Sequence, residues 1–447
     1  MLTKNQTTTS NIRTGFIGLL LAGTALSACA SYDTSSSYPE NWPILSAETP
    51  AAVGVAPEDV EALEAALSRY VDEGEVIGVA SLWVKDGEVV SYLADGRARV
   101  RTDEPIDEDT IYRIYSMTKP VTGVALMMLY EEGKFELDDP ITDHIPEFAN
   151  LVVLDGTNED GSVKTVPMER APTMRELMSH TAGFAYGLGG MDAANQAFRD
   201  QNLLQSPDLQ TFIDKVAQVP LLSQPGEQWY YSAAVDIQGY LVEKFSGQSF
   251  GSFLDERLFT PLGMDDTGFF VPDEDLDRFT DLTVWSNDYN TLVPIPTPSV
   301  QFTKDTLNME SGGGGLVSTL SDYARFCQMM LNEGEFNGAR ILKPETVELM
   351  TTNVLTGDQR VTVSGELSNA EVPPIGFGLD FAVALEDLEN GTSEGSYYWG
   401  GAAGTWFWID PEEDMFFIGM IQLFRGDKPR PDFREESAVM VYDALNK

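Results

Sequence analysis

Residues 111–120 read IYRIYSMTKP, and this stretch places Ser116 three residues before Lys119. It continues into PVTGVALMMLYEEGK at residues 120–134, whose apolar pattern predicts a helix. Residues three apart share a helix face, so the hydroxyl and the ammonium can meet over one pocket. A serine is nucleophilic only if a neighbour takes its proton, and a lysine shielded from water can do so. Taken alone, the pattern also fits a helix-capping serine followed by a surface lysine.

A second candidate group lies in QPGEQWYYSAAVDIQGYLVE at residues 224–243, where Tyr231-Ser232-Ala233 directly precedes a predicted helix. A tyrosine held against an ammonium has its phenolate favoured, so it can act as a general base for a nearby hydroxyl. Tyr231 is the candidate for this role. The adjacent Tyr230 is an alternative, because a shift of one residue in register would exchange the two side chains.

A third candidate group is Trp399-Gly400-Gly401, which lies on a predicted strand and is followed by Ala402. Glycines let backbone N–H groups approach a substrate oxygen without obstruction from side chains. Such N–H groups form an oxyanion hole when they point at the place where negative charge develops.

These three segments together resemble the serine β-lactamase and penicillin-binding superfamily, in particular its class C-like branch and the family VIII carboxylesterases. They occur in the order of that family, and the similarity extends from about residue 55 to the C-terminus. Four further segments match it: ELMSHTAGF at 176–184, PLGMDDTGF at 261–269, SGGGGLVSTLSDYARF at 311–326 and GTWFWIDPEED at 404–414.

The resemblance implies a β-lactamase/transpeptidase-like α+β fold, in which an antiparallel sheet flanked by helices is joined to an all-α lobe. It implies that Ser116 is the acylated nucleophile, Lys119 its proton partner and Tyr231 the base. The family pattern, in which Tyr-Ser is soon followed by an apolar-Asp pair, favours Tyr231 over Tyr230. The oxyanion hole and substrate contacts are expected from the backbone of Ser116 and from Trp399, Gly400, Gly401 and Ala402.

Two departures from the lactamase pattern bear on the substrate. Ala233 stands where lactamases usually carry an asparagine that contacts the substrate amide, and Trp399 stands where they carry the lysine of Lys-Thr-Gly. That lysine binds a substrate carboxylate, and losing one charge-assisted hydrogen bond costs about 1.5 to 3 kcal/mol. Tryptophan instead offers an apolar wall that suits the acyl or alcohol group of an ester. We therefore expect hydrolysis of small carboxylic esters with short acyl chains.

Two alternatives remain. The same residues would serve a β-lactamase or a D-amino-acid peptidase, and weak lactam hydrolysis could accompany esterase activity. A protein that is not an enzyme, namely a penicillin- or peptidoglycan-binding lipoprotein, would also carry these motifs.

The composition excludes several classes of function. Asp and Glu number 71 against 28 Lys and Arg, which gives the 447-residue chain a formal net charge of −43. Such a surface repels phosphate backbones, so nucleic acid is not an expected partner. Only two histidines and two cysteines are present, which disfavours zinc sites with several imidazole ligands. We expect neither a metal nor another cofactor, and we expect Cys327, in the apolar segment DYARFCQMML, to be buried.

The N-terminus predicts export. Lys4 and Arg13 precede and flank a short apolar run, GFIGLLLAGTAL, and Leu26-Ser27-Ala28-Cys29 closes it. This arrangement resembles a bacterial lipoprotein signal, in which residues 1–28 are removed and Cys29 is lipidated, so that the protein is anchored on the periplasmic side of a membrane, as an outer-membrane lipoprotein. An ordinary secretory peptide cleaved after Ala28 or Ala30 is the alternative. The lipid would be the only membrane contact.

Residues 29–52, rich in Ser, Pro and Ala, predict a tether, and residues 53–447 form the folded domain. Its start predicts a helix from residue 57 to Gly74 and then a hairpin that turns at Asp86-Gly87. Its end predicts two long strands joined by a turn at residues 410–414, followed by a helix. Helices fill the middle, so the fold class is α+β with an all-α lobe, and the site is expected in the cleft between the two parts.

Three other features of the sequence are candidates for a functional role. Gly247-Gln248-Ser249-Phe250-Gly251 matches the nucleophile elbow of α/β-hydrolases, but that fold needs a histidine after the serine and both histidines precede Ser249. His180 is expected to shape the edge of the pocket. The run Gly312–Gly315 lacks the Lys of a phosphate-binding loop and is expected to be a flexible connection. The oligomeric state is not predicted.

Overall fold

The computed structural model describes residues 38–39, 42–43 and 53–446, apart from residues 159, 161, 189, 297–301, 358, 362–373 and 425. The expected signal peptide at 1–28, the lipidation site Cys29 and most of the expected tether lie outside these residues. No helix in the described part of the chain is both long enough and apolar enough to span a bilayer. The similarity-based expectation of an α+β fold with an antiparallel sheet is confirmed.

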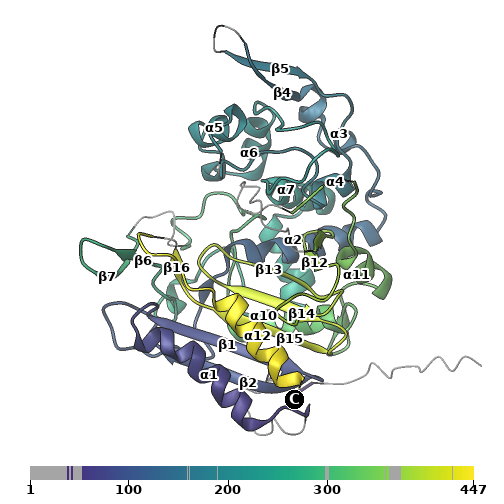
Figure 1. Cartoon of the computed structure of the whole chain (residues 1–447). Coiled ribbons are helices and arrows are strands. Elements are labelled where there is room, and N and C mark those ends of the chain that lie inside the picture. The colour runs from purple at the N-terminus through teal and green to yellow at the C-terminus, as the bar shows by residue number, and fades with distance from the viewer. Residues whose placement is uncertain are drawn as a thin grey trace, which may run out of the picture. The chain divides into compact units, whose positions relative to one another are not determined.

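A seven-stranded antiparallel sheet organises the domain, and both ends of the chain contribute strands (Figure 1). Its order is β11-β12-β13-β14-β15-β1-β2. The N-terminal hairpin consists of β1 (Gly78–Lys85) and β2 (Glu88–Gly96), and Asp86 and Gly87 adopt φ angles of 52° and 76° in the expected turn. The C-terminal part supplies β11 (Ile375–Phe377), β12 (Ala382–Ala384), β13 (Tyr397–Gly400), β14 (Trp406–Asp410) and β15 (Met415–Met420).

The prediction of two long C-terminal strands was wrong, because the first of them is broken into β13 and β14. Gly401 N–H donates to Thr405 O at 2.7 Å and Gly404 N–H donates to Gly401 O at 3.1 Å, which closes a tight turn. Gly404 has a φ of 93°, which only glycine adopts readily. The turn at 410–414 is present as expected, and β14 and β15 pair from Trp406 with Gly419 to Asp410 with Met415.

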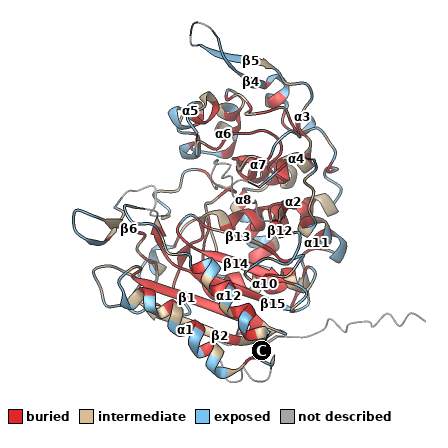
Figure 2. Cartoon of the chain, viewed as in Figure 1, coloured by how far each residue is buried: buried red, intermediate tan, exposed pale blue. Residues whose placement is uncertain are grey.

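Both faces of the sheet are covered, which explains why its central strands are almost wholly apolar. Helices α1 (Pro57–Asp72) and α12 (Phe433–Leu445) cover one face, and α10 (Leu320–Leu331) lies against the other (Figure 1). In β1, Trp83 faces the core under α1 and α12, whereas Leu82 faces the core on the side of α10. Figure 2 shows these strands buried between helices whose outer faces are exposed. Cys327 of α10 is buried, as expected.

The helical lobe centres on two buried helices that pack against each other, α2 (Thr118–Glu131) and α7 (Ala234–Ser246). The remaining helices are α3 (Ile141–His144), α4 (Met174–Met178), α5 (Ala193–Asp200), α6 (Leu209–Val216), α8 (Phe250–Leu254), α9 (Thr260–Leu262) and α11 (Pro344–Thr351). The remaining strands are β3 (Tyr112–Arg113) with β8 (Val317–Ser318), β4 (Val152–Thr157) with β5 (Val163–Pro167), β9 (Glu335–Phe336) with β10 (Ala339–Arg340), and β16 (Leu423–Phe424) with β6 (Thr283–Ser286) and β7 (Thr291–Pro294).

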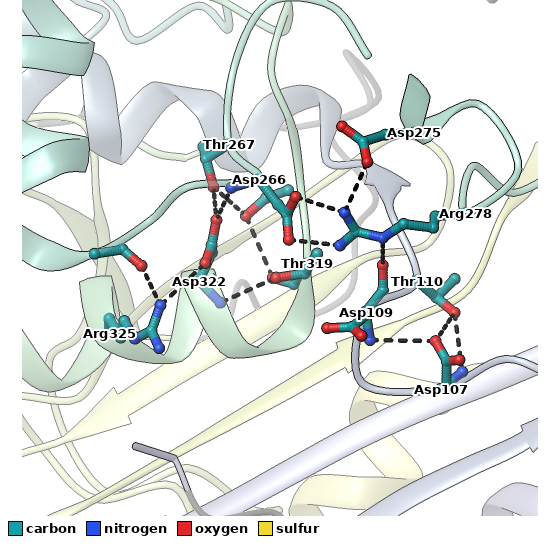
Figure 3. Close-up of polar contacts among 12 residues, drawn as sticks. Asp107, Asp109, Thr110, Asp266, Thr267, Asp275, Arg278, Thr319, Asp322 and Arg325 are labelled. Atoms are coloured by element: carbon teal, nitrogen blue, oxygen red, sulfur yellow. Dashed lines mark hydrogen bonds and ion pairs between the residues drawn. The ribbon is translucent and has the colours of Figure 1, made fainter. Parts of the chain in front are cut away.

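A polar network outside the sheet fastens the segment that leads to Ser116 (Figure 3). The Arg278 guanidinium bonds both carboxylate oxygens of Asp266 and donates to Asp109 O at 2.9 Å. The carbonyl of Arg278 accepts from Ile111 N–H at 3.0 Å. Nearby, burial raises the pKa of Asp322 to about 7, although Thr267 donates a hydrogen bond to this carboxylate. The network therefore ties residues 109–111 to the connection between α9 and β6.

Part of the expected tether is packed on the domain. Trp42 is only 4% exposed, and its ring lies 5.3 Å from that of Phe336 and 6.4 Å from that of Phe416. Trp42 Nε1 donates to Gly87 O at 3.1 Å, and Arg325 Nε donates to Trp42 O at 2.9 Å. A tryptophan held in this way contributes to the core of the domain.

We predict that Trp42→Ala lowers the free energy of unfolding by about 3 to 5 kcal/mol, because it leaves a cavity between Phe336 and Phe416. Chemical denaturation measures the change. Tyr289→Ala is the control, since Tyr289 is 75% exposed and its removal should be nearly neutral. Equal stability of Trp42→Ala and the unaltered protein would contradict the packing of this segment.

Candidate active site

Lys119 lies in the first turn of α2, on the helix expected from the sequence, and Ser116 lies just before that helix. A short 3₁₀ turn, Tyr115–Met117, precedes α2, so Ser116 is half-buried at its N-terminus. Tyr115 has a φ of 44°, which is unusual for a residue with a side chain. Its ring packs against Phe302 and Phe424, at centroid distances of 5.6 and 5.3 Å. Aromatic packing thus holds a strained backbone directly before the candidate nucleophile.

Lys119 is fully buried and is surrounded by oxygen atoms. Its Nζ contacts Ser116 Oγ at 3.3 Å, Tyr186 Oη at 3.1 Å and Gly313 O at 2.6 Å. It also lies 4.5 Å from the ring centroid of Tyr231, within the range of a cation–π interaction. The alternative prediction, in which Lys119 is a surface residue, is therefore wrong.

Tyr231, rather than Tyr230, reaches the serine. Tyr231 Oη donates to Ser116 Oγ at 2.6 Å, whereas Tyr230 Oη donates to Gln228 Oε1 at 2.8 Å. The serine oxygen therefore has two neighbours, Lys119 Nζ and Tyr231 Oη, either of which can take its proton when it is itself deprotonated, as an amine or a phenolate. This is the chemical requirement for a serine nucleophile without histidine.

The third predicted segment meets the nucleophile from the end of β13. Thr405 Oγ1 donates to Ile114 O at 3.2 Å, which holds the turn after Gly401 against the residues preceding Ser116. A side chain at Gly401 would collide with Ile114 O, so only glycine fits there. The N–H of Gly401 is already bonded to Thr405 O, whereas Ala402 is exposed and its carbonyl accepts from Arg430 at 3.0 Å. Gly400 faces the Arg434 guanidinium on α12.

Aromatic rings line the side of the site next to Tyr231. The ring of Trp399 lies 5.5 Å from that of Tyr231 and 5.5 Å from that of Phe377. Trp229 and His180 complete this cluster, with the His180 ring 5.3 Å from that of Tyr231. Trp399 is 6% exposed and contacts the proposed base. Aromatic rings therefore pack against Tyr231 at the segment where the lactamase pattern carries a lysine.

His180 has a supporting position behind Tyr231. Its Nδ1 is hydrogen-bonded to Ser232 Oγ at 2.8 Å and its carbonyl accepts from Tyr230 N–H at 3.0 Å. Burial, and secondly the charge of Lys119, lower the pKa of His180 well below its ordinary value. His180 therefore braces both residues that flank Tyr231, Ser232 through its neutral imidazole and Tyr230 through its backbone carbonyl.

Two contacts of Lys119 were not found from the sequence, those of Tyr186 and Gly313. The run Gly312–Gly315 is also not the flexible connection that we expected. Thr122 Oγ1 donates to Gly312 O at 2.8 Å, and Leu316 N–H donates to Thr118 Oγ1 at 3.1 Å, so the run is bonded along α2. No sequence signal marks a backbone carbonyl as the partner of a distant lysine, and Tyr186 has no diagnostic spacing from Lys119.

Ser249, the serine of the nucleophile-elbow match, has a structural role. Ser249 caps α8 by accepting from Ser252 N–H, so the Gly-x-Ser-x-Gly match is a helix start. Among the residues that the structure describes, no three His, Cys, Asp or Glu side chains are grouped so that they could hold a metal ion.

We predict that His180→Asn makes stability less sensitive to acid. In the unfolded chain a histidine binds a proton as the pH falls through about 6.5, whereas the native site excludes that proton, so stability falls by up to about 1.36 kcal/mol per pH unit. Asparagine does not titrate, tolerates the φ of 59° and can still bond to Ser232. Urea denaturation from pH 8 to pH 5 measures this. Identical pH dependence in both proteins would refute a neutral buried His180.

The chain is similar in sequence to known proteins. The model of the β-lactamase family, named Beta-lactamase, matches residues 63–439. Protein Rv1367c of Mycobacterium tuberculosis is 32% identical over 80% of this chain and 89% of its own length. Esterase EstB of Burkholderia gladioli is 28% identical over 77% of this chain and 86% of its own length.

In structure, simvastatin synthase (LovD) from Aspergillus terreus has a TM-score of 0.76 at 24% identity, over 88% of this chain and all of that one. Esterases and acyltransferases both occur among the sequence relatives. Together with the serine, lysine and tyrosine gathered at one site, these matches establish that the chain belongs to the β-lactamase family of serine hydrolases and acyltransferases.

Proposed function

We propose that the protein is a serine esterase of the family VIII type, which cleaves carboxylic esters with short acyl chains through an acyl-enzyme on Ser116. The observation that carries this proposal is that Tyr231 Oη and Lys119 Nζ both contact Ser116 Oγ, at 2.6 and 3.3 Å, beside the indole of Trp399. The two contacts of Ser116 Oγ support acyl transfer. The apolar wall, which replaces a cationic one, supports an ester without a carboxylate as the substrate.

The reaction has two steps. Ser116 Oγ attacks the ester carbonyl while its proton passes to the Lys119–Tyr231 pair, and the oxyanion is stabilised by backbone N–H groups, for which we propose those of Ser116 and Ala402. The C–O bond to the alcohol then breaks, and the alcohol leaves with that proton. Water attacks the acyl-enzyme, gives one proton to Tyr231 and releases the acid, and Ser116 regains its proton. An alcohol in place of water would give acyl transfer by the same steps.

We predict that Ser116→Ala lowers kcat/KM for p-nitrophenyl butyrate by about 10³-fold or more, because no other hydroxyl can be acylated. Lys119→Ala should lose nearly as much, and the double variant little more, since the two residues act as a unit. The matched control is Ser249→Ala, which removes a helix cap and should keep the activity. Full activity of Ser116→Ala, in a preparation free of host esterases, would disprove the proposal.

The alternatives are separated by the same preparation. A β-lactamase or D-amino-acid peptidase would turn over nitrocefin or a D-alanyl peptide with a higher kcat/KM than the ester. A penicillin-binding sensor would keep a stable adduct on Ser116 in intact-mass spectrometry, and a peptidoglycan binder would show neither adduct nor product. Transient acylation with release of the acid is the outcome that we expect.

We also propose that Cys29 is lipidated and anchors the protein on the periplasmic side of the membrane, on the strength of the signal at residues 1–29. In a bacterial host, the protein should then fractionate with membranes and Cys29→Ser should be soluble. The mass of the purified chain, which would begin at Cys29 with added acyl groups, gives an independent check. A mature chain that begins after Ala28 or Ala30 and carries no acyl group would instead indicate ordinary secretion.

A further inference from the structure

The ammonium of Lys119 has no acid side chain as a direct hydrogen-bonding partner among the described residues; its shortest contact is the carbonyl of Gly313, at 2.6 Å. A carbonyl can orient a lysine only if the residue that carries it is held in place. The environment of Gly313 therefore bears directly on the position of Lys119 relative to Ser116.

Asp236 holds Gly313 from the other side, through the N–H of the peptide that precedes this carbonyl. It lies on the first turn of α7 and is completely buried. Its Oδ1 accepts from Gly313 N–H at 3.1 Å and also from the hydroxyl of Ser311. Gly313 thus gives its N–H to Asp236 and its carbonyl to Lys119, so that one residue links the carboxylate to the ammonium.

The packing around Gly313 leaves no room for a side chain. A Cβ at this position would lie 2.6 Å from Asp236 Oδ2 and 2.7 Å from Tyr186 Oη. Tyr186 in turn contacts Lys119 Nζ at 3.1 Å. Asp236 Oδ2 is buried without a hydrogen-bond partner among the described residues. An unsatisfied buried carboxylate oxygen is costly to fold, which argues for a role beyond stability.

We propose that Asp236 is a positioning residue, which fixes the Gly313 carbonyl so that Lys119 Nζ is directed at Ser116 Oγ. The proposal rests on the proposed serine chemistry of this site. It explains why the glycine run is bonded to both helices, to α2 through Thr122 and to α7 through Asp236. It also assigns a function to the one acidic residue of the first turn of α7, five positions after Tyr231.

The test compares three variants by their rate of labelling with a fluorophosphonate, which phosphorylates an activated serine whatever the natural substrate, and by kcat and KM for p-nitrophenyl butyrate. Asp236→Ala should lower the labelling rate and kcat by about 100-fold, the scale of a 1 Å misplacement, with KM nearly unchanged. Asp236→Asn keeps an acceptor oxygen for Gly313 and should stay within about tenfold of the unaltered protein. Gly313→Ala should resemble Asp236→Ala.

The matched control is Asp380→Ala. Asp380 is another buried carboxylate that bonds to α7, through Gln238 Nε2 at 3.1 Å, but among the described residues no hydrogen bond joins its side chain to the glycine run. This variant should lose stability and keep its labelling rate per folded molecule. Circular dichroism and thermal unfolding establish which molecules are folded.

The outcomes separate the two proposals. If the unaltered protein does not react with the fluorophosphonate, the serine chemistry itself is wrong. If it reacts and folded Asp236→Ala or Gly313→Ala reacts equally fast, the positioning role of Asp236 is wrong. If Asp236→Asn is as slow as Asp236→Ala, the negative charge matters and the hydrogen bond to Gly313 does not, which also overturns the inference.

Discussion

The burial of the Lys119 ammonium is the constraint on which the site depends. A charge removed from water must regain its hydrogen bonds from the protein, and here Ser116 Oγ, Tyr186 Oη and Gly313 O surround Nζ. These oxygens come from three distant parts of the chain. Satisfying one amine therefore brings α2, the loop after α4 and the glycine run together, and the same contacts direct the amine at the serine.

The sheet supplies the second half of the site by a long-range connection. Its central strands come from opposite ends of the chain, with β1 paired to β15 and β15 to β14. The turn between β13 and β14 is fastened to Ile114, two residues before Ser116. Because both faces of the sheet are covered by helices, this turn cannot shift without disturbing two cores. The candidate nucleophile Ser116 thus lies where the sheet meets the pair formed by α2 and α7.

Within this shared frame, the aromatic cluster distinguishes the chain from a lactamase pattern. Trp399, at the position where the lactamase pattern carries a lysine, packs edge to face with Phe377 and at a tilt of 45° against Tyr231. His180, kept neutral by burial, supports Tyr231 from behind without adding a second cation beside Lys119. The net charge of −43 bears on solubility and does not describe the site, where aromatic rings surround Tyr231.

The amino-acid sequence by itself determined the local features: the Ser116–Lys119 spacing, the helix 57–72, the hairpin at Asp86-Gly87 and the chain order of three motifs. These depend on residues close in sequence, for which periodicity and turn chemistry are sufficient. The family pattern favoured Tyr231 over Tyr230, and the tertiary structure places Tyr231 Oη against Ser116. Only the tertiary structure broke the expected long strand at Gly401–Gly404, packed Trp42 onto the domain and revealed Tyr186, Gly313 and Asp236 near Lys119. Each of these depends on contacts between distant segments. A contact made by a backbone carbonyl or a buried ring has no characteristic sequence spacing, so its partner cannot be predicted from the sequence.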